Sequence, residues 1–393
     1  MELHPRFPRI PKRLGALFFA NFFLALHLFG VLYYNSTYLK AIGVNTEAIG
    51  SIYALGSFCA ILGFILYPRL LRHFKIRGVL TLLVLTEGLA FVLLASNPAP
   101  LITIGAFLIY LAVFPLLILS LDVLLEGTME SESSTGKIRG AYLTLQSTAL
   151  ISAPFIAGFI LADVRFSLLY SIAALLLIPF FAVAQSAMRS FKDPKYHDLH
   201  VFHSLQFLRK SRDLRGAFLA HFLLRLFFSF MVVFTPIYLI EHIGLTTGEF
   251  GLLMALVLLP FALLEFPLGL LADRKIGEKE ILVIGFLVIA GATASLSFIE
   301  STYFWFWVAI LFVTRVGASC IEISTESYFF KHVDGNDAHL MSLFRMLRPV
   351  GYLVGPLLGS IFLAVMDFKM IFVSLAVLLF CGIAIVVPMK DTR

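Results

Sequence analysis

A few ionisable side chains interrupt the long apolar runs of this 393-residue sequence. Those nearest the middle of a run are Glu87, Arg225, Glu265 and Arg315, with His27 and His221 as titratable neighbours. A charged side chain at the centre of a bilayer costs about 2.5 to 3.5 kcal/mol on insertion scales, so it requires a partner, a water-filled cavity or a function. If the runs cross a membrane, these groups can bind a charged solute or carry a proton.

The two mid-run arginines are the first candidates for solute binding. The planar guanidinium of Arg225 or Arg315 suits a carboxylate or a phosphate group. His221 stands one helical turn before Arg225 and shares its face. The alternative is internal neutralisation, with Arg225 paired to Glu265 and Arg315 to Glu322, which leaves the charge of the solute open. Further polar candidates for solute contact are His27, Tyr33, Tyr34, Asn35 and Gln146.

Coupling to protons requires a group that changes charge as a binding cavity opens to each side of the membrane. Glu265 is the first candidate, because Gly269 and Asp273 follow it at i+4 and i+8 and share its helix face. Glu87 is the second candidate, and a structural role within its helix is the alternative. His27 could also switch, although a histidine satisfied within a helix interface is the other interpretation.

A second group of charges lies toward one end of the apolar runs. The group consists of Asp122, Glu126, Glu322, Glu326, Arg345 and Arg348. Its four carboxylates form one i, i+4 pair in each half of the chain, and on helices each pair makes an acidic stripe that can meet the arginines. Such ion pairs would either brace one bundle or hold a gate closed and break when it opens. Both interpretations stay open.

The elements that carry these residues are membrane-spanning helices. Sixty per cent hydrophobic residues, 14% charged residues and a mean hydropathy of +0.95 exclude an ordinary soluble protein. A spanning helix needs roughly 20 apolar residues, and the runs are too long and continuous for barrel strands. Twelve spans are predicted, at 14–39, 47–68, 78–95, 99–125, 138–162, 165–187, 215–240, 248–272, 280–299, 302–329, 338–364 and 369–388.

The positive charge of the chain indicates how these helices are oriented. The net charge of +6 falls in short clusters between spans, which indicates membrane topology rather than nucleic-acid binding. With both termini in the cytoplasm, the outside keeps only Lys40, Arg165 and Lys369. We therefore expect a multi-pass protein of the inner or plasma membrane. Its predicted parts are a six-helix bundle at 1–187, a cytoplasmic linker with a surface helix at 188–213, and a second six-helix bundle at 214–393.

The two halves repeat one another at an offset of about 200 residues. Gly50 corresponds to Gly251, Asp122 and Glu126 correspond to Glu322 and Glu326, and Ala153-Pro154 corresponds to Gly355-Pro356. Matches that keep nearly the same offset over several helices indicate a parallel duplication of six helices.

One loop carries a known signature. The segment Gly269-Leu-Leu-Ala-Asp273-Arg274-Lys275-Ile-Gly277-Glu-Lys279 resembles the loop motif of the major facilitator superfamily of transporters, and the resemblance extends over essentially the full chain. It implies two six-helix bundles around a central cavity that rock between inward-open and outward-open states. It also implies that Asp273 and Arg274 belong to a charge network at the cytoplasmic face.

These features together predict a secondary transporter of a small organic solute that works by alternating access, with proton coupling left open. We expect a monomer without cofactor, metal or catalytic residues, since the sequence offers no phosphate loop and no convincing nucleophile or metal cluster. One rival is a lipid-handling flippase of the same fold. The other is a polytopic membrane enzyme acting on lipid-linked substrates through Asp122 and Glu126. Duplicated acidic stripes favour the transporter over the enzyme.

Overall fold

The computed structural model describes residues 12–126, 132–163, 165–188, 211–271, 277–332 and 338–390, together with Thr128, Phe191, Asp193 and Leu208. Every regular element within these residues is a helix. The first half of the chain forms α1 (Lys12–Leu32), α2 (Asn35–Ala41), α3 (Thr46–Ser96), α4 (Pro100–Glu126), α5 (Glu132–Ile160) and α6 (Phe166–Met188).

The first predicted span is divided into α1 and α2. The turn lies at Tyr33 and Tyr34, directly before the polar segment Asn35-Ser36-Thr37. Short polar side chains compete for backbone hydrogen bonds and so favour helix ends. The hydroxyl of Thr37 makes such a bond, donating to the carbonyl oxygen of Tyr34 at 2.7 Å.

The second and third predicted spans form one helix, α3, of 51 residues. At 1.5 Å per residue it measures about 75 Å, more than twice the thickness of a bilayer core. It changes direction at Lys75, whose φ of 59° and ψ of 167° are not helical. The backbone amide of Ile76, released there from the helical hydrogen-bond ladder, donates to a carboxylate oxygen of Asp193 at 2.9 Å. The bend thus supplies the connection between two spans without a loop.

The second half forms α8 (Arg212–Ile237), α9 (Thr247–Val257), α10 (Leu259–Leu271), α11 (Glu278–Ser295), α12 (Phe304–His332), α13 (Ala338–Leu363) and α14 (Met370–Val386), with a π-helix at Tyr238–His242 after α8. The predicted span 248–272 is divided at Leu258. Pro260 has no amide hydrogen to donate to the carbonyl of Leu256, so the helix loses a backbone hydrogen bond at this point.

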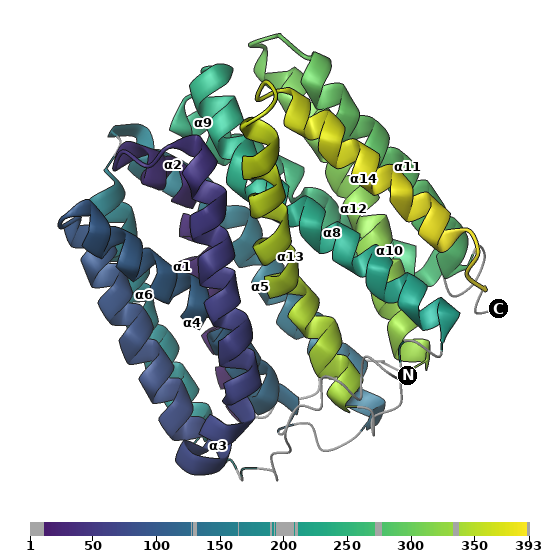
Figure 1. Ribbon diagram of the computed structural model, residues 1–393. Coiled ribbons are helices and arrows are strands. Elements are labelled where there is room, and N and C mark those ends of the chain that lie inside the picture. The colour runs from purple at the N-terminus through teal and green to yellow at the C-terminus, as the bar shows by residue number, and fades with distance from the viewer. Residues whose placement is uncertain are drawn as a thin grey trace, which may run out of the picture.

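The helices of the two halves lie side by side, as Figure 1 shows. α1, α3, α4 and α6 gather on one side, and α8, α11, α12 and α14 on the other. Two long helices join the halves, since α5 packs against α1 of the first half and α9 of the second, and α13 packs against α8 of the second half and α3 of the first. These are the helices in which the sequence places the corresponding Pro154 and Pro356 segments.

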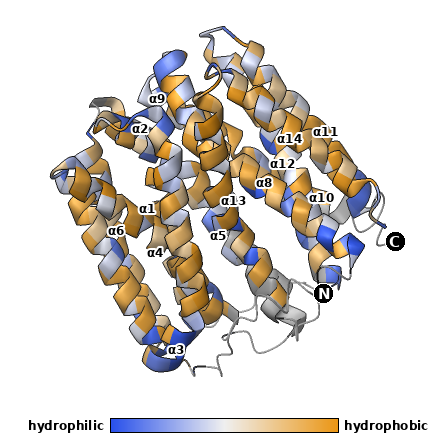
Figure 2. Ribbon diagram, viewed as in Figure 1, coloured by the Kyte–Doolittle hydropathy of each residue, from blue (hydrophilic) through white to orange (hydrophobic). Residues whose placement is uncertain are grey.

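The exterior of the molecule is apolar over the length of the helices, and hydrophilic residues gather toward their ends (Figure 2). Leu101, Phe298 and Val365 are each at least three-quarters exposed, as expected for surfaces that face lipid. Among the described residues, nine helices are long and apolar enough to cross a membrane. One of them is the bent α3, and two shorter apolar helices, 145–160 and 370–386, add to them. The predicted class, an all-α polytopic membrane protein with about twelve spans, is confirmed.

Candidate functional site: a charged cavity between the halves

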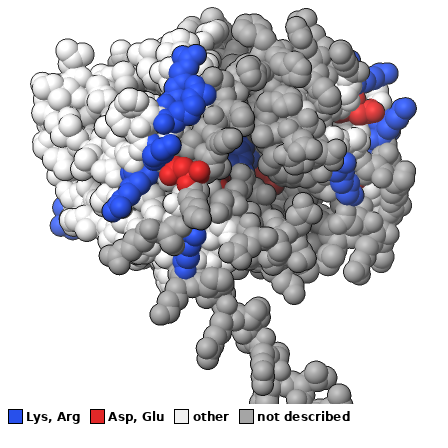
Figure 3. All heavy atoms as spheres, turned by 90° about the horizontal axis from the view of Figure 1, so that it is seen from below, with Lys and Arg blue, Asp and Glu red and all other residues white. Residues whose placement is uncertain are grey.

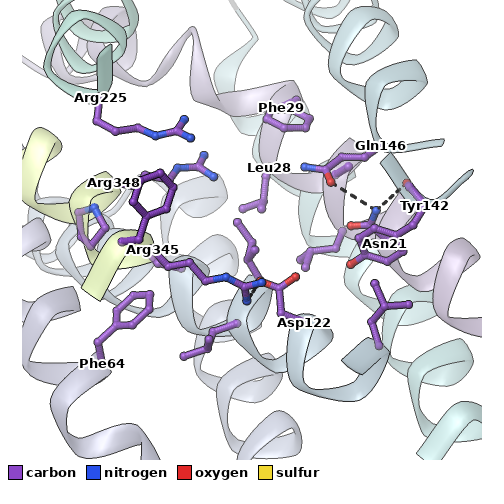
Figure 4. Close-up of a pocket in the computed structure, with 18 of the residues that line it drawn as sticks. Asn21, Leu28, Phe29, Phe64, Asp122, Tyr142, Gln146, Arg225, Arg345 and Arg348 are labelled. Carbon is purple, nitrogen blue, oxygen red and sulfur yellow. Dashed lines mark hydrogen bonds and ion pairs between the residues drawn. The ribbon is translucent and has the colours of Figure 1, made fainter. Parts of the chain in front are cut away.

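Two adjoining cavities of about 230 and 280 Å³ lie between the halves of the molecule. They share the wall residues Phe29, Gln146, Arg225, Glu326 and Arg348. Since these residues come from α1 and α5 of the first half and α8, α12 and α13 of the second, we treat the two spaces as one central cavity. In Figure 4 the side chains of Arg225 and Arg348 extend from one side of it toward Phe29 and Gln146, and that of Arg345 extends toward Asp122.

A chain of hydrogen bonds within the second half holds the guanidinium of Arg225. Its Nη2 lies 2.9 Å from Oε1 of Glu322, and its Nε donates to Nε2 of His221 at 3.0 Å. The other ring nitrogen of His221 lies 2.9 Å from the hydroxyl of Thr325. Because an arginine Nε can only donate, Nε2 of His221 must accept, and the ring is a neutral tautomer with its proton on Nδ1. His221 thereby fixes the orientation of Arg225.

Two further arginines in the cavity wall have no ion-pair partner among the described residues. Arg315 is 3% exposed, and its Nε and Nη1 make no hydrogen bond within that part of the chain. Its guanidinium carbon lies 5.3 Å from the ring centre of Phe227. The guanidinium carbon of Arg348 lies 6.0 Å from the ring centre of Phe114. Aromatic faces attract these cations but do not neutralise them.

At the end of the molecule that carries α2 and α9, the halves meet closely. The hydroxyl of Tyr34 lies 3.2 Å from the carbonyl oxygen of Pro154 and 3.1 Å from that of Thr247. There α5 and α9 approach so closely that a Cβ on Gly251 would lie 3.0 Å from the Cα of Gly158. We call this contact, together with its counterpart between α3 and α13, the seal.

The counterpart is built from the repeat-related residues. A Cβ on Gly50 would collide with the carbonyl oxygen of Pro356 and with the hydroxyl of Ser360. That hydroxyl accepts a hydrogen bond from the backbone amide of Gly50 at 3.2 Å. At the rim, Nζ of Lys40 lies 3.4 Å from a carboxylate oxygen of Glu241.

At the opposite end, where α3 bends, an ion pair joins the halves. Nη1 of Arg345 in α13 lies 2.6 Å from Oδ2 of Asp122 in α4. Figure 3 views the molecule from this end, and both basic and acidic atoms are visible in a hollow near the middle of the face. The pair Asp122–Arg345 therefore spans the two halves, whereas Arg225–Glu322 lies within the second half.

A separate buried polar cluster lies inside the first half. His27 and Glu87 are both fully buried, with Nε2 of His27 3.4 Å from Oε1 of Glu87. The Nδ1 of His27 donates to the carbonyl oxygen of Ala173 at 2.8 Å. Near the α2 end, the amide group of Asn35 bonds to the hydroxyls of Tyr110 and Tyr170, at 3.1 and 2.8 Å.

The second half of the chain also matches a known family. Residues 217–392 match the family model described as Major Facilitator Superfamily. The second half of the chain therefore carries the sequence pattern of the major facilitator superfamily. The protein is a multi-pass membrane protein and a secondary transporter of a small molecule, not an enzyme.

Solved transporter structures share the fold over nearly the whole chain. An auto-inhibited peptide transporter of the POT family is similar at a TM-score of 0.78, with 11% identity and 98% of each chain covered. The nucleoside transporter NupG is similar at a TM-score of 0.72, with 14% identity, 96% of this chain and 100% of the other covered. A POT family transporter in complex with a thioalcohol-conjugated peptide has a TM-score of 0.74 at 16% identity, covering 97% of this chain and 96% of its own. No curated protein matches the sequence.

Within this superfamily fold, the structure brings some of the predicted site residues together and separates others. The residues that line the central cavity are Gln146, His221, Arg225, Arg315, Asp122, Glu322, Glu326, Arg345 and Arg348. Tyr34 lies in the seal, while His27, Asn35 and Glu87 lie in the buried cluster of the first half. Glu322 bonds to Arg225, whereas the sequence suggests that it neutralises Arg315. Gly269 lies in the last part of α10, whereas the side chains of Glu126 and Glu265, and residues Asp273 and Arg274, lie outside what the structure describes.

Several cavity residues have no distinguishing signal in the sequence. Tyr352 and Ser147 line the cavity beside Arg315 and Arg348, next to the predicted Tyr33, and Asn21 lines its other part. Asn21 lies within 3.5 Å of the side-chain oxygen of Gln146, to which its amide donates. In a sequence with 13 tyrosines, a cavity tyrosine cannot be told from one in the core. The repeat distinguishes Asn21, because Ala20-Asn21-Phe22 corresponds to Ala220-His221-Phe222 at the same offset of 200 residues.

Proposed function

We propose that the protein carries a small polar organic solute across the cell membrane by alternating access, with the central cavity as the binding site. One observation carries the proposal: a charged cavity lies between the two halves and is bordered at one end by the seal. In the predicted orientation, with both termini in the cytoplasm, the seal closes the cavity toward the outside. The conformation described is then the one in which the solute would exchange with the cytoplasm.

Transport in this proposal requires two sets of contacts to alternate. The seal must part for the cavity to reach the outside, and the halves must then close at the end where α3 bends. The ion pair Asp122–Arg345 already links the halves at that end. It would either stabilise the inner face when that face is closed or break when that face opens. We assign residues 1–187 and 214–393 to the two moving bundles, 188–213 to the linker, and the activity to a monomer.

Proton coupling is the second part of the proposal, and it rests on His27 and Glu87. Because Nδ1 of His27 donates to a carbonyl oxygen, its Nε2 bears a proton only when the ring is charged. A hydrogen bond between Nε2 and Glu87 therefore requires a second proton in addition to the one on Nδ1. This second proton lies on either the imidazole or the carboxyl group. The remaining carboxyl oxygen of Glu87 has no partner among the described residues. Loss of this one proton would leave a net negative charge within the first half. Glu265 remains the alternative coupling residue.

The charge of the cavity favours a polar solute over a lipid. Four arginines and three carboxylates line it, and an acyl chain would leave these groups without water or partners. A flippase would need a path that stays apolar for the lipid tails.

The test is solute uptake and efflux in proteoliposomes, with and without an imposed pH gradient. A panel of labelled anions, cations and neutral solutes would be compared in wild type, Arg225→Ala, Glu87→Gln and Glu265→Gln. Arg165→Ala and Glu47→Gln, which alter exposed charges outside the cavity, are the matched controls. We expect flux that Arg225→Ala removes and that both controls retain. Folded protein that moves no member of the panel would contradict the proposal and favour lipid handling.

A further inference from the structure

The central cavity carries more positive than negative side chains. Its described walls contain Arg225, Arg315, Arg345 and Arg348, against Asp122, Glu322 and Glu326. Arginine stays protonated in proteins, so the four positive charges are permanent, whereas a carboxylate can only lose its charge by binding a proton. The described walls of the cavity therefore carry a net positive charge at every pH at which the protein is folded.

The ion pairs of the cavity wall show where this excess charge lies. Arg225 is paired with Glu322, and Arg345 with Asp122. Arg315 and Arg348 remain, and even if Glu326 is counted against one of them, the other keeps its charge. Both line the same part of the cavity, beside Tyr33 and Tyr352.

The burial of Arg315 makes this arrangement costly for the empty protein. The residue is 3% exposed, and two of its guanidinium nitrogens have no acceptor within the described part of the chain. A buried charge without a partner destabilises a protein unless something else supplies the opposite charge. No acidic side chain of the described residues lies in an ion pair with it, so within this part of the chain the acceptor that it lacks has to be water or a bound solute.

We infer that the transported solute is a small organic anion whose carboxylate binds between Arg315 and Arg348. The hydroxyls of Tyr33 and Tyr352 border the same space and can donate to the anion. Apart from Gln146, Ser147, Arg225, Glu322 and Glu326, the rest of the wall is apolar, with Phe29, Phe228 and Phe261 among its members. It suits a compact apolar or aromatic body, and about 280 Å³ limits that body to a small molecule. The inference rests on the proposed function, since it concerns the same cavity.

Equilibrium binding to the purified full chain tests the inference independently of transport. The probes are 3-phenylpropanoate, its uncharged amide, 3-phenylpropylamine, and phenyl phosphate to separate carboxylate from phosphate recognition. Thermal stabilisation of the protein and isothermal calorimetry would report binding up to about 10 mM. We expect the carboxylate to bind and the amide and amine not to. Arg315→Gln and Arg348→Gln should each weaken binding by roughly tenfold to a hundredfold, since each loses a charged hydrogen bond.

Three comparisons keep the outcome decisive. Arg165→Gln, an exposed cation outside the cavity, should bind like wild type, and Arg315→Lys should recover part of the affinity while showing that the site still folds. Equal binding of the amide or amine, unchanged binding in Arg315→Gln, or no binding of either anion would overturn the inference. Stronger binding of phenyl phosphate would reassign the anionic group to phosphate. If liposomes transport neutral or cationic solutes but no anions, the inference fails while the proposed function stands; if they transport nothing, the proposed function itself fails.

Discussion

A Cβ on Gly251 of α9 would lie 2.7 Å from the carbonyl oxygen of Pro154 in α5. The repeat-related Gly50 of α3 stands in the same relation to the carbonyl oxygen of Pro356 in α13. In each case the residue four positions after the proline, Gly158 or Ser360, completes the contact. The two inner faces of the seal are thus copies of one another, each pairing a helix of one half with a helix of the other.

Gly251→Leu should prevent the seal from forming. The added side chain would overlap a rigid helical carbonyl, so the conformation closed at this end would lose most of its population. We expect transport to fall by roughly tenfold or more, because every cycle must pass through that conformation. A cysteine at position 147 of the cavity wall, in a chain without Cys59, Cys320 and Cys381, should react faster with a membrane-impermeant maleimide added outside.

The matched control is Gly248→Leu, three residues earlier in the same helix, since a Cβ at Gly248 meets no heavy atom within 4 Å. Equal labelling and transport in Gly248→Leu and Gly251→Leu would show that the close approach at Gly251 has no part in the transport cycle.

The ion pair Asp122–Arg345 should influence conformation more than stability. Its side chains are about a quarter exposed, so we expect Asp122→Asn to change the unfolding free energy by only about 1 kcal/mol or less. Because the pair joins the two halves, the same variant should change the rate at which the cavity is labelled from the cytoplasmic side. Asp122→Arg combined with Arg345→Asp should restore part of the wild-type rate. A double variant no better than either single variant would indicate that the charges act separately.

His221 should matter through Arg225 rather than by contact with the solute alone. His221→Ala removes the acceptor for Arg225 Nε and the bond to Thr325, and we expect a loss of about 2 kcal/mol in stability. His221→Gln keeps a side-chain oxygen that can accept from Arg225, so it should retain more solute affinity than His221→Ala. Equilibrium binding and thermal unfolding of the two variants would be compared. Equal affinity in both would show that the orientation of Arg225 does not depend on this bond.

The sequence predicted the helices and the duplication better than it predicted the partners of the charges. Hydropathy located the spans, because the length of an apolar run can be read directly from the sequence and determines whether a helix can cross the bilayer. Hydropathy could not show that α3 continues through Lys75 or that the span at 248–272 divides at Leu258. Each of these features depends on the backbone conformation of one residue, which hydropathy does not report. The repeat correctly related Gly50 to Gly251, but nothing in the spacing indicated that these glycines face Pro356 and Pro154.

The partners of Glu322 and Asp122 show why the charge network was harder to predict. The two residues correspond in the repeat, yet Glu322 bonds within its own half and Asp122 bonds across to the other. Which neighbour a carboxylate meets depends on the rotation and tilt of adjacent helices, and these are set by packing rather than by spacing along one helix. Glu322, which the sequence pairs with Arg315, is therefore bonded to Arg225 instead. The sequence does identify both arginines as candidates for the same site.

Glu87→Gln should separate solute movement from proton movement. The substituted amide cannot exchange a proton with His27, so accumulation driven by a pH gradient should disappear, while exchange of labelled for unlabelled solute should continue at a rate within about threefold of wild type. His27→Asn should have the same effect, because it removes the other member of the pair. Proteoliposomes with an internal pH dye would measure both fluxes, with Glu47→Gln as the exposed carboxylate control. Gradient-driven accumulation that persists in Glu87→Gln but stops in Glu265→Gln would move the coupling site to α10, and accumulation that persists in both would exclude either carboxylate from the proton pathway.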